Sequence, residues 1–497
     1  MCGITGLWGE TDVQEVEAMM RTLKHRGPDG SGTFTGKGGV LGHRRLAIMD
    51  PEMGQQPYED NTLGLAANGE LYNWRELRQS IRSAHTFKTD ADTEVALHLF
   101  EEEGARSLKG LDGMFALAFA NGEELVLARD PIGIKPLYYS QRQEGGPLRF
   151  ASEMKALVGD GAPITAVPPG SMYSSKGGLS RFYELPDPAD RLSNVDDIIS
   201  RLRHTLSEAT QKRLMSDVPL GAFLSGGLDS SIIVALMMQQ RKRVHTFSVG
   251  LGGSPDLEAA RLVADTLGTQ HHEYRFTAGE VKEALPNIIY HLESFDQDLV
   301  RSVIPTYFTA RLAADHVKVI LTGEGADELF AGYTYYRDYT DYGALHDELR
   351  RSISAMHNVN LQRVDRMTMA HSLEGRVPFL DTALIELALR IPSELKLYRR
   401  GTQRPVEKWI LRRAFADLLP EEIVWRDKAQ FDEGSGTTAM LEQFIEEVTK
   451  DMDVEAFRAK RPEVLLRSAE ECFYYSIFEE VFESPELLVP NIGRWTT

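Results

Sequence analysis

The sequence predicts two domains of different fold class: an antiparallel α+β domain, followed by an α/β domain with a parallel sheet. In roughly the first third of the chain, short β segments alternate with glycine-rich turns. Strands alternate with helices over residues 220–321. Between these parts, Glu184–Asp190 is rich in proline and aspartate and has too few apolar residues for a core element. We therefore expect domains at residues 2–184 and 197–497, joined by a linker at 185–196.

The first domain contains one clear hairpin and one clear helix. The apolar segments Met114–Ala120 and Glu124–Ala128 flank Asn121-Gly122, and Asn-Gly favours the two positive φ angles of a type I′ turn. A helix is predicted from about Thr93 to Glu103, because apolar residues recur at i,i+4 and Gly104 can end it. The strand pairs of this domain are therefore expected to be antiparallel.

The second domain alternates between the two periodicities. The predicted elements are strand Leu220–Leu224, helix Ser230–Gln240, strand Val244–Val249, helix Pro255–Leu267, helix Val281–Leu292 and strand Val317–Leu321. This alternation indicates right-handed crossovers and a parallel sheet that is covered on both faces. From about residue 343 onward the pattern is mostly helical.

Net charge, apolar runs and cysteine count exclude several classes of protein. The 497 residues carry a net charge of −19, which disfavours binding to nucleic acids and anionic membranes. The apolar runs fall short of the roughly 18–20 residues of a transmembrane helix, and the start of the chain lacks a targeting pattern. Two cysteines, Cys2 and Cys472, are too few for a disulfide framework. We expect a cytoplasmic protein with no nucleic-acid or membrane partner.

Cys2 and three later segments form a candidate site. Once the initiator methionine is removed, the Cys2 thiol lies beside a free α-amine that can serve as its general base. Arg45 suits a carboxylate, Asn68-Gly69 offers an amide and a backbone N–H, and Asp92 suits an ammonium group. Together they can hold an amino acid at both ends. The simpler explanations are an inert buried thiol, a solvated charge, a turn and a helix cap.

These residues belong to segments that occur in the order seen in class II glutamine amidotransferases. The segments are Cys2-Gly3-Ile4, His25–Asp29, Arg45-Leu46, Asn68–Asn73 and Arg129–Tyr139. The resemblance implies an N-terminal-nucleophile hydrolase fold, two antiparallel sheets between helical layers, that hydrolyses the side-chain amide of glutamine. It also implies that Cys2 is the nucleophile and that Asn68 and Gly69 form the oxyanion hole. The implied glutamine-binding residues are Arg45, Leu46, Ala47, Ile48, Met49, Asn68, Gly69, Glu70 and Asp92.

A second candidate site begins at Ser225–Ser231, which follows an apolar strand and opens a helix. Two glycines, serine hydroxyls and the helix N-terminus suit phosphate oxygens, although the Gly-Lys-Ser/Thr ending of a Walker loop is missing. An acidic loop, Thr322–Glu328, follows another strand, and ligands gather at the carboxyl ends of parallel strands. Asp229 and Asp327 therefore suit Mg²⁺ that bridges a triphosphate. The alternatives are a capped glycine-rich turn and two solvated acids.

Another metal candidate, His271-His272-Glu273, is weaker, because adjacent histidines on an extended segment point to opposite faces.

From Cys2 to about residue 480 the chain resembles glutamine-hydrolysing asparagine synthetases of the bacterial type. The segments that carry this resemblance are Ser225–Ser231, Gly323–Glu328, Glu374–Asp381 and Lys428–Phe431. It implies ATP-dependent synthesis of asparagine from aspartate through β-aspartyl-AMP, with Mg²⁺ as the metal, ammonia from glutamine, and a homodimer. The by-products would be glutamate, AMP and pyrophosphate.

The same resemblance assigns residues to the second site. The implied ATP-binding residues are Phe223, Leu224, Ser225, Gly226, Gly227, Leu228, Asp229, Ser230, Ser231, Val249, Thr322 and Gly323. Glu324 would assist at the acyl-adenylate, and Lys428 would hold phosphate charge. Mg²⁺ would be bound by Asp229 and Asp327. An apolar passage for ammonia is expected near Arg26, Met114 and Ala151–Lys155. Ala331 departs from the family pattern, which commonly has glycine there.

Two other functions are compatible with the residues. The first is a related amidotransferase that acts on a different carboxylate, with the difference expected around Asp296–Pro305. The second is a sensor that binds glutamine or ATP without catalysis. Intact Cys2, Ser225–Ser231 and Asp327 disfavour the sensor.

Overall fold

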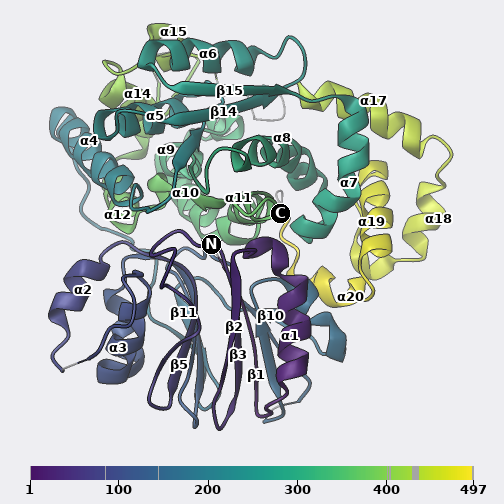
Figure 1. The fold of residues 1–497 in the computed structure, drawn as a ribbon. Helices are drawn as coiled ribbons and strands as arrows, with labels where there is room; N and C mark the ends of the chain where they lie inside the picture. The colour runs from purple at the N-terminus through teal and green to yellow at the C-terminus, as the bar shows by residue number, and fades with distance from the viewer. Residues whose placement is uncertain are drawn as a thin grey trace.

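The computed structural model describes residues 2–494, apart from residues 84, 144, 400, 402, 403 and 428–435. Figure 1 shows the β-rich N-terminal domain below the larger C-terminal domain. Within the described part of the chain, no helix is both long and apolar enough to span a membrane.

The N-terminal domain consists of two six-stranded sheets between helices. One sheet has the order β10-β8-β9-β1-β3-β2 and the other β12-β11-β7-β6-β5-β4, with antiparallel neighbours. The strands are β1 (Gly3–Trp8), β2 (Gly30–Thr35), β3 (Gly39–Arg45), β4 (Tyr58–Asp60), β5 (Leu63–Leu71), β6 (Gly113–Ala120), β7 (Leu125–Arg129), β8 (Tyr138–Gln141), β9 (Leu148–Ala151), β10 (Ile164–Ala166), β11 (Ser171–Ser174) and β12 (Gly178–Arg181). Helix α1 (Val13–Thr22) packs on the first sheet, whereas α3 (Glu94–Glu103), with α2 (Trp74–Ser80) beside it, packs on the second. The predicted class of this domain is confirmed.

The predicted hairpin forms between β6 and β7, but its turn is not type I′. Gly122 has a φ of +82°, whereas Asn121 is not among the residues with positive φ. Instead, the Asn121 side-chain oxygen accepts hydrogen bonds from the N–H groups of Glu123 and Glu124 at 3.1 and 2.9 Å. Asparagine side chains often close turns in this way, which removes the need for a second positive φ.

The C-terminal domain contains a five-stranded parallel sheet of order β15-β14-β13-β16-β17. Its elements up to the last of these strands are α4 (Val195–Lys212), β13 (Leu220–Phe223), α5 (Leu228–Gln240), β14 (His245–Gly250), α6 (Pro255–Leu267), β15 (Gln270–Arg275), α7 (Ala278–Leu292), α8 (Gln297–Ala314), β16 (Val319–Leu321), α9 (Ala326–Phe330), α10 (Tyr342–Ala355), α11 (Asn360–Met369) and β17 (Glu374–Arg376). The predicted strands and helices occur within a few residues of their expected ends, so the parallel-sheet class is confirmed.

The remaining chain is mostly helical, as expected. It contains α12 (Thr382–Arg390), α13 (Ser393–Lys396), β18 (Leu397–Tyr398), β19 (Val406–Glu407), α14 (Trp409–Phe415), α15 (Glu421–Val424), α17 (Thr437–Thr449), α18 (Val454–Ala459), α19 (Ala469–Val481) and α20 (Pro485–Leu488). The last four of these helices lie to one side of the parallel sheet, drawn in yellow and yellow-green (Figure 1). Strand β12 ends at Arg181 and α4 begins at Val195, whereas the exact limits of the domains stay a prediction.

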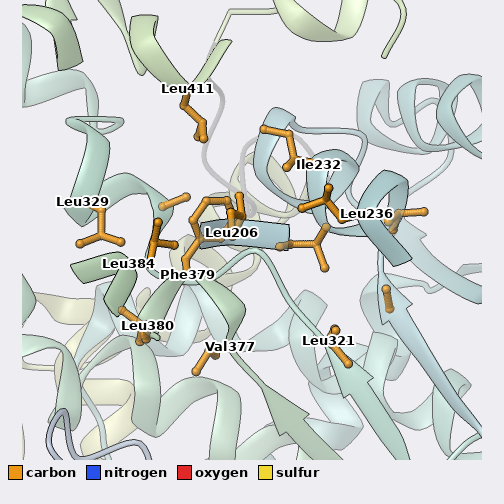
Figure 2. Packing of buried hydrophobic residues seen from close by; sticks show 14 of the residues in the cluster. Leu206, Ile232, Leu236, Leu321, Leu329, Val377, Phe379, Leu380, Leu384 and Leu411 are labelled. Carbon is orange, nitrogen blue, oxygen red and sulfur yellow. The ribbon is translucent and has the colours of Figure 1, made fainter. Parts of the chain in front are cut away.

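Apolar side chains from both sides of the parallel sheet form the main core of the second domain. Figure 2 shows part of it, with Leu206 of α4, Ile232 of α5 and Phe379 packed together, each 0% exposed. Burial of side chains of this size stabilises the fold by about 1.5–3 kcal/mol each. The core holds α5 firmly behind β13, and this positions the loop between them.

Two candidate active sites

Cys2 lies immediately before β1 and is 8% exposed. Its backbone nitrogen donates a hydrogen bond to Asn68 Oδ1 at 3.0 Å, and its Sγ lies 3.9 Å from the Leu46 carbonyl. Burial raises the pKa of the Cys2 thiol above its usual value. The thiol therefore needs a base to become a nucleophile. The Cys2 nitrogen would be that base once Met1 is removed and the amide becomes an amine.

An unpaired amide donor lies beside this thiol. Asn68 of β5 is fully buried, and its Nδ2 has no hydrogen-bond partner among the residues described. Gly69 has a φ of +151°, and a Cβ there would lie 1.9 Å from the Met114 carbonyl oxygen, so glycine is required. A buried donor with no internal partner is suited to an oxygen that becomes negative during a reaction.

Two buried carboxyl groups lie on the same side of β5. Asp92, just before α3, is 3% exposed, and its Oδ2 accepts a hydrogen bond from Leu71 N–H at 2.6 Å. Burial raises the pKa of Asp92 to about 7. Burial and the Asp92 charge also raise the pKa of Glu70 well above its usual range. Glu70 Oε2 lies 3.3 Å from Arg376 of the second domain. Asp92 offers negative charge for an ammonium group once it is ionised.

The Arg45 side chain forms hydrogen bonds to the loop that follows it in the chain. Its terminal nitrogens donate to the carbonyls of Met49, Asp50 and Pro51 at 3.3, 2.6 and 2.9 Å. The guanidinium therefore holds the loop that follows Leu46, Ala47 and Ile48, which are all buried. Of the residues predicted for the first site, Asn68 and Leu46 contact Cys2 directly.

Buried charges connect this region to the second domain. Arg26 is 0% exposed, donates from Nε to the Cys2 carbonyl at 3.0 Å, and forms ion pairs with Glu153 and Asp365 at 2.7 and 2.8 Å. Arg366 contacts Glu153 and Glu293 at 3.1 and 2.8 Å. Removing one partner of such a pair leaves a buried charge uncompensated, at a cost of about 3–5 kcal/mol. The network therefore fixes the two domains against each other beside Cys2.

The second site is a cavity at the carboxyl ends of β13, β14 and β16. It is lined by Phe223, Leu224, Ser225, Gly227, Leu228, Asp229, Ser230, Phe247, Ser248, Asp256, Thr306, Thr309, Thr322, Gly323, Glu324, Asp327, Arg363, Val364, Glu407, Lys408, Arg412, Arg426 and Asp427. Most of the residues predicted for phosphate and adenosine binding are in this set. Gly226, Ser231 and Val249 do not line it.

The loop between β13 and α5 has the shape that phosphate binding requires. Gly226 has a φ of +72°, and a Cβ there would lie 2.4 Å from Ala260 N, so the loop can pass α6 only with glycine. Gly227 is the N-cap of α5 and its cap position carries no side-chain hydrogen bond. The first turn of α5 therefore presents N–H groups and a partial positive charge to the cavity.

Lys408 is a site residue that the sequence analysis missed. Its side chain is 2% exposed, and its Nζ lies 2.5 Å from both Asp229 Oδ2 and Asp327 Oδ1. The two carboxylates thus converge on one point, and Asp229 Oδ1 is buried without a hydrogen-bond partner among the residues that the structure describes. This arrangement fits Mg²⁺, which takes one or two carboxylates together with phosphate oxygens. Local sequence offers no signal for Lys408, because it reaches the cavity from the start of α14.

Acidic residues continue from this point into α9. Glu324 forms an ion pair with Arg363 at 2.6 Å and accepts a hydrogen bond from Asn360 at 3.0 Å. Burial, reinforced by the Glu324 charge, raises the pKa of Glu328 to about 8. At the end of α9, Ala331 has a φ of +57°, which explains why glycine suits this position.

Two sequence predictions are not placed in the cavity. Lys428 lies outside the described residues. On α8, it is Thr306 and Thr309 that line the cavity, whereas the predicted acceptor segment Asp296–Pro305 does not. Asp296 is fully buried and is paired with Arg467 at 2.6 Å. The role of this segment in acceptor choice stays a prediction, and α8 packs against the C-terminal helices.

Comparisons with known proteins match both parts of the chain. Residues 1–173 match the family described as "Glutamine amidotransferase domain", and residues 201–342 and 337–489 match "Asparagine synthase". The chain is 39% identical over 510 residues to "Asparagine synthetase [glutamine-hydrolyzing] 3" of Arabidopsis thaliana, covering 97% of this chain and 88% of the relative. It is 40% identical over 521 residues to "Asparagine synthetase [glutamine-hydrolyzing] 2" of Oryza sativa subsp. japonica, covering 99% and 88%. It is 38% identical over 513 residues to "Asparagine synthetase B [glutamine-hydrolyzing]" of Escherichia coli (strain K12), covering 98% and 92%.

Proposed function

The chain belongs to the family of glutamine-hydrolysing asparagine synthetases, and from this premise we propose how its two sites divide the reaction. The enzyme makes asparagine from aspartate with ATP and with ammonia taken from glutamine. One observation supports assigning the two half-reactions to separate sites. A single chain contains both the buried Cys2–Asn68 pair and the cavity suited to phosphate.

In the first site, the Cys2 thiolate attacks the side-chain amide carbon of glutamine. The Cys2 α-amine takes the thiol proton and delivers it to the leaving ammonia. Asn68 Nδ2 and the Gly69 N–H stabilise the oxyanion, while Arg45 binds the carboxylate and Asp92 with Glu70 the ammonium group of glutamine. One wall of the proposed glutamine site is formed by the residues after Arg45, which are Leu46, Ala47, Ile48 and Met49. Water then hydrolyses the thioester to glutamate.

In the second site, the β-carboxylate of aspartate attacks the α-phosphorus of ATP, which gives β-aspartyl-AMP and releases pyrophosphate. Ser225–Ser231 binds the pyrophosphate part, while Phe223, Leu224, Thr322 and Gly323, which line the cavity, surround the adenosine. Ammonia then attacks the acyl carbon, and Glu324 takes the proton that this nitrogen must lose. Asparagine and AMP are the products.

Mg²⁺ and two lysines would support this chemistry. Asp229 and Asp327 would hold Mg²⁺, which when bound neutralises phosphate charge. Lys408, already placed between these carboxylates, and Lys428 would share the charge of the leaving pyrophosphate.

Ammonia has to pass between the sites unprotonated, because ammonium is not a nucleophile. The buried domain interface around Arg26, Met114 and Ala151–Lys155 supports a closed route for it. The proposal also includes a homodimer in the cytoplasm that acts on small molecules. Two free cysteines and a net charge of −19 support this environment.

The proposal is tested by pyrophosphate release from Mg²⁺-ATP with a panel of carboxylate acceptors and either glutamine or ammonia. We expect release with aspartate, together with one asparagine per pyrophosphate. Glutamate and β-alanine are the matched acceptors, since they change the chain length or remove the α-carboxylate. If aspartate is inert while glutamine is still hydrolysed, the enzyme uses another carboxylate.

The pKa of Asp92 predicts how glutamine use depends on pH. Asp92 attracts ammonium only when ionised, and burial raises its pKa to about 7. The kcat/KM for glutamine should therefore fall as pH drops below about 7, approaching tenfold per pH unit. Because the Asp92 charge also raises the pKa of Glu70, the measurement compares Asp92→Asn with Glu70→Gln. An acid limb that is the same in Asp92→Asn as in the unaltered enzyme would assign it to another group.

A further inference from the structure

Four ligand-type side chains meet on the glutaminase domain, outside both sites described above. Asp60 ends β4, His85 lies in the segment before α3, and His98 and Glu101 lie on one face of α3 at i,i+3. One ligand atom from each lies within 4.8 Å of those from the others. We propose that Asp60, His85, His98 and Glu101 bind one divalent transition-metal ion, with Zn²⁺ as the expected ion. We call this cluster the α3 metal site.

His98 carries the strongest indication. It is 1% exposed, and neither ring nitrogen has a hydrogen-bond partner within the described ranges. Its Nδ1 lies 3.9 Å from Asp60 Oδ2, too far for a hydrogen bond but close enough for a shared ion. A buried imidazole whose nitrogens lie beyond hydrogen-bond distance of the nearby carboxylates is costly, and an ion between His98 and Asp60 would offset this cost.

Further carboxylates lie behind the two histidines. Glu94 Oε1 is 3.7 Å from His98 Nε2, and Glu102 Oε1 is 3.3 Å from His85 Nε2. Both carboxylates are fixed in place, because Glu94 accepts the Thr89 N–H at 2.8 Å and Glu102 accepts backbone N–H groups of the same segment. A carboxylate on the far ring nitrogen is the usual partner of a metal-bound histidine, since it orients the ring and strengthens the ligand.

The donor set selects the kind of ion. Two neutral imidazoles and two carboxylates balance a charge of +2, and mixed nitrogen and oxygen ligands suit Zn²⁺ more than Mg²⁺ or Ca²⁺. Zinc bonds of about 2.0–2.2 Å place tetrahedral ligands roughly 3.3–3.6 Å apart. His85 Nδ1 is already 3.4 Å from Glu101 Oε2, so the remaining atoms need to approach by about 1 Å.

A second histidine cluster is a weaker candidate. His245, His272 and His316 also place ring nitrogens within 4.8 Å of one another. However, His245 Nδ1 and His272 Nε2 already share a hydrogen bond at 3.0 Å, and the set has three ligands without a carboxylate. As predicted, His271 and His272 face opposite ways, with His271 bonded to Thr246. The test below separates the two clusters.

Occupation of the α3 metal site would join β4, the segment at residues 81–90 and α3. Because α3 begins two residues after Asp92, the ion would stabilise the helix that positions this carboxylate. The metal assignment does not depend on the proposed function.

The experiment titrates chelator-treated, full-length protein with Zn²⁺ in competition with a chromophoric chelator, and follows the melting temperature of the same samples. The variants are His85→Gln and Asp60→Asn, both partly exposed, so that the fold is retained. His204→Gln and Glu103→Gln are the matched controls, because both residues are exposed and lie outside the cluster.

We expect one tight zinc site in the unaltered protein, weakened at least 10- to 100-fold in His85→Gln and Asp60→Asn and unchanged in the controls. The rise in melting temperature with zinc should disappear in the same two variants. The inference fails if the unaltered protein has no tight site or if both variants keep it. It also fails if the tight site is lost in His272→Gln or Cys2→Ala, which would place the ion elsewhere.

Discussion

Replacement of Cys2 by alanine is expected to abolish glutamine hydrolysis and to leave ammonia-dependent asparagine synthesis within about twofold of the unaltered enzyme. Loss of a covalent nucleophile removes a factor of at least about 10⁴ from turnover. The cavity of the second domain contains no part of Cys2, so ATP use should continue when ammonia is supplied. Glutaminase and pyrophosphate-release assays on one preparation measure both effects.

Cys472→Ala is the matched control, because Cys472 is the other cysteine of the chain and is buried in α19. It should keep both activities. A variant with alanine inserted between Met1 and Cys2 tests the α-amine separately, since the thiol remains while the free amine moves away from it. If this insertion retains full glutaminase activity, the α-amine is not the base.

Replacement of Lys408 by methionine is expected to reduce asparagine synthesis by at least about 10²- to 10³-fold with either nitrogen source. Methionine keeps much of the side-chain length but removes the ammonium group that lies 2.5 Å from Asp229 and Asp327. Two carboxylates would then face the phosphates without their cation. The measurement is pyrophosphate release at saturating ATP, with KM for Mg²⁺-ATP measured in parallel.

Glutamine hydrolysis in the same Lys408→Met protein shows whether the variant is folded, since the first site lies in the other domain. Lys242→Met is the matched control, because Lys242 is exposed and lies two residues after the end of α5. We expect it to leave both activities unchanged. Near-normal synthesis in Lys408→Met would mean that this lysine only neutralises the two carboxylates before ATP binds.

Local pattern predicted most of the second domain's elements. Helix α6 occurs at Pro255–Leu267 as expected, because proline opens it and Gly268 ends it with a left-handed φ. The predicted type of the β6–β7 turn was wrong. The dipeptide Asn121-Gly122 allows two turn geometries, and hydrogen bonds to the Asn121 side chain form the observed one. Turn geometry depends on hydrogen bonds that composition does not specify.

The phosphate loop was predictable because its residues are contiguous. Ser225–Ser231 form a single turn and the first turn of α5. Lys408 was not predictable in this way, since it is about 180 residues from Asp229 and meets it only in the folded domain. For the same reason the ion pair of Asp296 was not predictable. The burial of Asp296 against Arg467 comes from helices near the end of the chain.

The sequence by itself determined the fold classes, the family and the segments around Cys2 and Ser225, because periodicity and contiguous motifs are encoded over short distances. Only the tertiary structure decided which distant polar groups lie close together: Lys408 with two aspartates, Arg26 with Glu153 and Asp365, and His98 near Asp60. Such pairs are selected by how helices and sheets pack around a common core. The local sequence around one partner therefore does not predict the other.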